Sequence, residues 1–74
     1  MLIHLGGGEV LDEDEIVGIF DLDTASASRI TREFLEAREA AGELRTQGTG
    51  LPRYFTVTRS DTVYLSQSSG KPVI

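Results

Sequence analysis

The sequence contains no cysteine, so neither a disulfide nor a thiolate metal site can stabilise its fold. It also lacks long apolar runs, because stretches such as residues 16–20 are far shorter than the roughly 20 residues that cross a bilayer. No basic segment precedes the first apolar residues, which is unlike a secretory signal. From these absences we expect a cytoplasmic protein with no membrane insertion.

The chain is also short, with 74 residues. A domain of this size buries only about 60% of the surface that its unfolded chain exposes, so its own core is marginal. Without disulfides or a structural metal, association with further copies is the usual supplement. We therefore expect a single domain that works as a homo-oligomer.

Three segments carry patterns typical of β-structure. Residues 2–5 and 9–11 flank three glycines and predict a hairpin. Residues 16–20 are β-branched and aromatic, and apolar on both faces, which predicts a strand placed centrally in the sheet or at a subunit contact. Residues 54–66 alternate in polarity on both sides of Ser60-Asp61 and predict a second hairpin.

One segment has the pattern of a helix. Residues that cap helix starts are frequent over 21–28, and Gly42 suits the position just past a helix end. Between them the apolar residues recur at intervals of four, three and four, which predicts one apolar stripe on a helix (Ile30, Phe34, Ala37 and Ala41).

These elements predict an α+β fold: a small, mostly antiparallel sheet with one main helix over residues 1–66, followed by a polar C-terminal tail over 67–74. The apolar surface exceeds what one helix and a small sheet can hide. We therefore predict an oligomer interface formed by the first-half strand and the helical stripe (Ile16, Ile19, Phe20, Ile30 and Phe34).

Patterns for catalysis or cofactor binding are missing. His4 has no partner nearby for general-base work, and the serines of residues 66–69 lack a nucleophile elbow. The acids of residues 12–15 are not spaced as a calcium loop, and the glycines of residues 6–8 do not lead into Gly-Lys-Ser/Thr. We expect no catalytic residue, no metal and no cofactor.

The net charge of −5 is unevenly distributed. Residues 1–42 hold ten acids and three arginines, whereas residues 43–74 hold two acids, three arginines and one lysine. Arg45, Arg53 and Arg59 flank the glycine-rich loop and the second hairpin, where guanidinium groups can grip phosphates. We predict nucleic-acid binding by these arginines, repeated around an oligomer; the alternative is that they are solvated or paired with acids of the first half.

The order of several motifs resembles the RemB-like branch of the extracellular matrix regulatory protein family. The segments that carry the resemblance are Ile3-His4-Leu5-Gly6, Ile16-Val17-Gly18-Ile19-Phe20-Asp21, Glu33-Phe34-Leu35, Gly50-Leu51-Pro52-Arg53 and Tyr64-Leu65-Ser66. The resemblance implies an α+β fold, assembly into rings or related homo-oligomers, and control of the transcription of biofilm matrix genes in bacteria.

The family's RemA branch binds the DNA backbone through arginines, and this chain departs from that branch at two places. Glu15 stands where that branch has an arginine before its central strand, and Gly50-Leu51 stands where it has an arginine pair. Two hypotheses follow: a DNA-binding regulator of matrix genes, and a homo-oligomeric interaction module that binds other proteins and no DNA.

Overall fold

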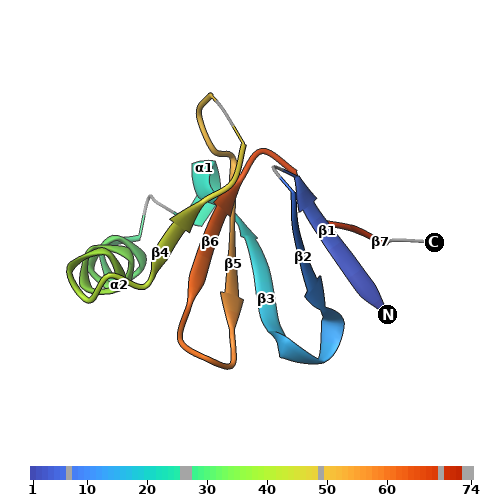
Figure 1. Cartoon of the computed structure of the whole chain (residues 1–74). Coiled ribbons are helices and arrows are strands. Elements are labelled where there is room, and N and C mark those ends of the chain that lie inside the picture. The colour runs from blue at the N-terminus through green and yellow to red at the C-terminus, as the bar shows by residue number, and fades with distance from the viewer. Residues whose placement is uncertain (7, 26–27, 49, 69, 73–74) are drawn as a thin grey trace.

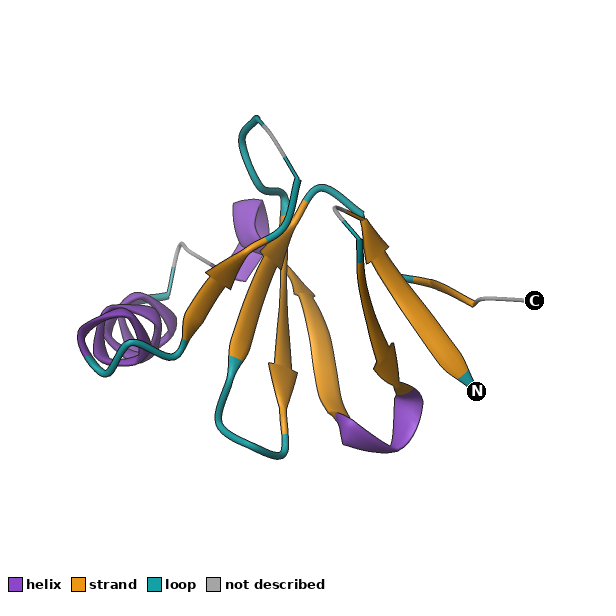
Figure 2. Cartoon of the chain, in the orientation of Figure 1, coloured by secondary structure: helices purple, strands orange, loops and turns teal. Residues whose placement is uncertain are grey.

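A computed structural model of the chain describes residues 1–6, 8–25, 28–48, 50–68 and 70–72. Within them, two sheets and one main helix form a mixed α+β domain (Figures 1 and 2). The elements are β1 (Leu2–Gly6), β2 (Glu9–Asp12), η1 (Glu13–Glu15), β3 (Ile16–Asp21), α1 (Leu22–Ala25), α2 (Arg29–Ala40), β4 (Leu44–Thr46), β5 (Tyr54–Thr58), β6 (Val63–Ser66) and β7 (Lys71–Pro72). The predicted fold class is confirmed, although the strands divide into two sheets and not one.

The smaller sheet has the strand order β2-β1-β7. The glycines of residues 6–8 predict the hairpin β1–β2, which the structure contains. Gly8 has φ 92°, a backbone conformation that residues other than glycine rarely adopt. The third strand, β7, pairs with β1 through Ile3 opposite Pro72. Part of the segment predicted as a tail thus belongs to a sheet.

The larger sheet has the order β3-β5-β6-β4. The predicted second hairpin is confirmed as β5–β6, whose turn places Asp61 at φ 67°. Of the two places predicted for the strand of residues 16–20, the centre of the sheet is wrong, because β3 pairs with β5 alone and forms one edge; its place at a subunit contact stays a prediction. The other edge, β4, runs parallel to β6, and the sequence pattern did not predict it.

Buried residues lie on both faces of the larger sheet, one turned toward the smaller sheet and the other, with Phe55, toward α2. Leu5 from the smaller sheet and Thr56 and Ser66 from the larger sheet are fully buried. Gly70 lies close to Ile3 and Ile19, since a Cβ atom on it would fall 2.9 Å and 3.0 Å from their side chains. In the described part of the chain the buried apolar residues are few (Leu5, Leu11, Phe55 and Val63).

The helix α2 begins after its N-cap Ser28 and ends before Gly42, which takes the left-handed conformation at φ 74°. Both ends agree with the sequence. Its orientation differs from the expected one: the half-buried residues are Thr31, Leu35 and Arg38, while the predicted stripe is exposed. No residue of α2 is buried.

Candidate functional site

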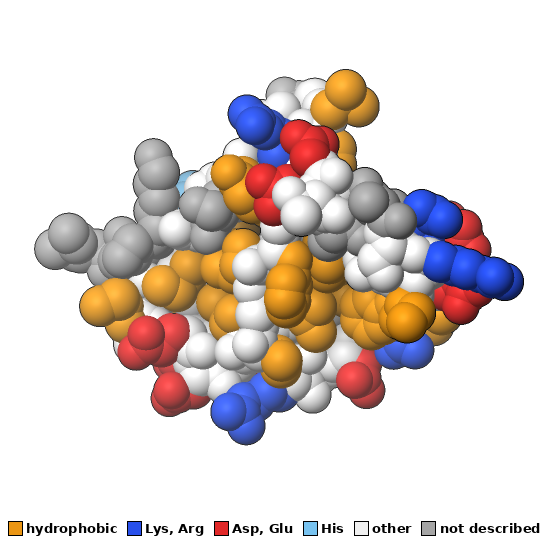
Figure 3. All heavy atoms as spheres, turned by 180° about the vertical axis from the view of Figure 1, so that it is seen from behind, with side chains coloured by type: hydrophobic (Ala, Val, Ile, Leu, Met, Phe, Trp, Pro, Cys, Tyr) orange, Lys and Arg blue, Asp and Glu red, His pale blue; other side chains and the backbone are white. Residues whose placement is uncertain are grey.

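An apolar groove lies between α2 and the outer face of the larger sheet. Its volume is about 260 Å³, and it is lined from α2, β3 and β5 (Phe20, Ile30, Thr31, Phe34, Phe55 and Val57). We call this surface the apolar groove. Figure 3 shows apolar side chains gathered across the middle of the rear face, with charged side chains around the margin.

Two stacked aromatic rings form the floor of the apolar groove. Phe20 and Phe55 are direct cross-strand partners, and their ring centroids lie 5.1 Å apart at an interplanar angle of 26°. Phe55 is 4% exposed and Phe20 is 45% exposed, so one ring belongs to the core and the other opens to the surface. Gly18 makes room for the Phe20 ring, because a Cβ atom on Gly18 would lie 2.6 Å from Phe20 Cζ.

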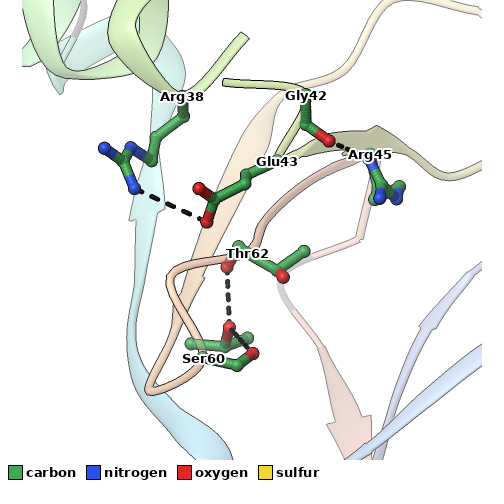
Figure 4. A network of polar contacts seen from close by, with 7 residues as sticks. Arg38, Gly42, Glu43, Arg45, Ser60 and Thr62 are labelled. Carbon is green, nitrogen blue, oxygen red and sulfur yellow. Dashed lines mark hydrogen bonds and ion pairs between the residues drawn. The ribbon is translucent and has the colours of Figure 1, made fainter. Parts of the chain in front are cut away.

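The helix α2 forms one wall of the groove, and polar contacts fix it near its C-terminal end. There the Arg38 guanidinium lies 3.5 Å from the Glu43 carboxylate (Figure 4) and 5.9 Å from the Phe34 ring centroid. The ion pair is long, with both of its side chains half-buried. A cation–π contact contributes about 0.5 to 1 kcal/mol at an exposed site and more where it is desolvated. At the other end of the helix, Ile30 is 79% exposed and Phe34 is 37% exposed.

The five predicted interface residues do not form one surface. The structure brings together Phe20, Ile30 and Phe34 as lining of the apolar groove. Ile19 instead faces the smaller sheet near Gly70, and Ile16 is half-buried and does not line the groove. Phe55 and Val57 complete the groove, although the sequence pattern singled out neither.

The three predicted nucleic-acid-binding arginines are exposed but lie apart. Arg53 precedes β5 and Arg59 follows it, which separates them by about 20 Å at the rise of an extended strand. Along the strand direction, Arg45 lies between Arg53 and Arg59, since it stands in β4 opposite Tyr64 of β6. One chain therefore does not collect them on one rim.

None of these arginines pairs with a carboxylate within the described residues. The Arg45 guanidinium donates to the carbonyl of Gly42 at 2.6 Å (Figure 4) and to that of Leu44 at 3.4 Å. Neither Arg53 nor Arg59 forms an ion pair within the described residues. By contrast, Arg29 and Arg38 are paired with Glu33 and Glu43. Within the described part of the chain, Arg45, Arg53 and Arg59 are thus not paired with the acids of the first half.

A polar contact joins the two sheets at Tyr64. Burial raises the pKa of the Tyr64 phenol, and Glu9 of β2 raises it further by its charge and by a hydrogen bond. The positive charge of Arg45 lowers the pKa of Tyr64, and the negative charge of Glu15 raises it. The Tyr64 phenol therefore keeps its proton to a higher pH than a solvated tyrosine does.

The described residues contain no group of three His, Asp or Glu side chains placed to hold a metal ion. None of their helices is long and apolar enough to cross a membrane. Comparison with known proteins found no family model and no curated protein that matches the chain.

Proposed function

We propose that the chain is a homo-oligomeric bacterial regulator of the extracellular matrix regulatory type, which acts in the cytoplasm by binding and not by catalysis. The observation that carries the oligomer is the open apolar groove beside a helix with no buried residue. Isolated helices of about 12 residues are marginal in water, and most helical stability in proteins comes from packing of an apolar face.

The exposed apolar residues of the groove are better explained by a permanently bound partner than by a transient one. Within the described residues four apolar side chains are buried, while Phe20, Ile30 and Phe34 remain open. Fully burying such a side chain stabilises a protein by about 1.5 to 3 kcal/mol, which is large for a small domain. The partner that is always present at matching concentration is another copy of the chain.

DNA is the proposed ligand because Arg45, Arg53 and Arg59 are exposed and lack carboxylate partners in the described structure. Their separation within one chain makes a single subunit a poor DNA binder. An assembly repeats each arginine at fixed spacing, and many weak phosphate contacts then add. The resemblance to the matrix regulators supports transcription of biofilm genes as the process.

A second candidate is a homo-oligomeric interaction module that binds other proteins and no DNA. The observation that favours it is the chemistry of the second loop, where Leu51 is 86% exposed at a position that is basic in the DNA-binding branch. Glu15, also exposed, would repel phosphate. The interaction module would be the same oligomer as the regulator, but its ligand would be a protein and not DNA.

Titration of labelled duplex DNA at low and moderate salt separates the two candidates. The regulator predicts binding that weakens as salt rises and that falls on Arg53→Ala. Arg29→Ala is the matched control, because it removes the same charge from a residue already paired with Glu33 at 3.0 Å. Absence of binding at low salt, with the oligomer intact, would reject the regulator and leave the interaction module.

A further inference from the structure

We draw no further inference here: the strongest candidate, the apolar groove between α2 and the outer face of the larger sheet, belongs to the site already described, and nothing in the structure shows which surface covers it.

Discussion

Phe20 and Phe55 stack across neighbouring strands with their ring centroids 5.1 Å apart, yet Phe55 is buried and Phe20 is nearly half exposed. Buried residues of the domain are thus continuous with the apolar groove. A partner that covers Phe20 would extend the core across a subunit boundary. This relationship makes the apolar groove, more than any charged cluster, the feature on which the proposed function depends.

Gly18→Ala should disturb this pair. The added methyl group would fall 2.6 Å from Phe20 Cζ, so the ring has to leave its present position beside Phe55. We expect a loss of about 1 to 3 kcal/mol in the free energy of unfolding, as for other overpacked sites, together with weaker assembly. Urea unfolding measures the first effect and light scattering the second; an unchanged oligomer would indicate that the Phe20 ring is not part of the contact.

Thr56→Val should stabilise the fold. The Thr56 side chain is fully buried and its hydroxyl has no hydrogen-bond partner in the described structure, so its replacement by a methyl group of similar size removes an unsatisfied polar atom. We expect a gain of about 1 kcal/mol in the free energy of unfolding by urea.

The matched control for Thr56 lies two residues along the same strand. Thr58 is also buried, but its hydroxyl donates to the Thr62 carbonyl at 2.7 Å. Thr58→Val should therefore destabilise by about 1 kcal/mol. Equal effects of the two substitutions would mean that the Thr56 hydroxyl is satisfied by a water molecule.

Stability should fall at high pH because of Tyr64. Its pKa is raised in the folded state, chiefly by burial and then by Glu9, so above the ordinary value of 10.0 the unfolded chain loses the phenolic proton while the folded chain keeps it. The unfolded state is then favoured increasingly until the pH passes the folded-state pKa. Urea unfolding between pH 9 and 11 should show this loss in the natural chain and a smaller one in Tyr64→Phe.

Much of the fold follows from local pattern. The alternation over residues 54–66 defines the β5–β6 hairpin, and the capping residues with Gly42 define α2, because turn chemistry and periodicity act between near neighbours. The strand β4 was missed because it has three residues and pairs in parallel with β6, a contact that depends on the register of distant segments.

The candidate site was predicted in part. The sequence predicted an oligomer interface that includes Phe20, Ile30 and Phe34, and the structure gathers these three in one groove. It could not pair Phe20 with Phe55, since cross-strand register is not visible in either strand alone. Nor could it show that α2 leaves Leu35 half-buried and Ile30 exposed.

Assembly through the apolar groove is best measured by light scattering at micromolar concentration on the natural chain and on Ile30→Asp. Because Ile30 is 79% exposed in the single chain, the substitution should change the stability of a monomer by no more than about 0.5 kcal/mol. We expect a natural chain with a multiple of the single-chain mass and a folded, monomeric Ile30→Asp, while Val10→Asp stays assembled. A natural chain of single-copy mass, or an Ile30→Asp variant that assembles as before, would mean that the groove is not the contact between copies.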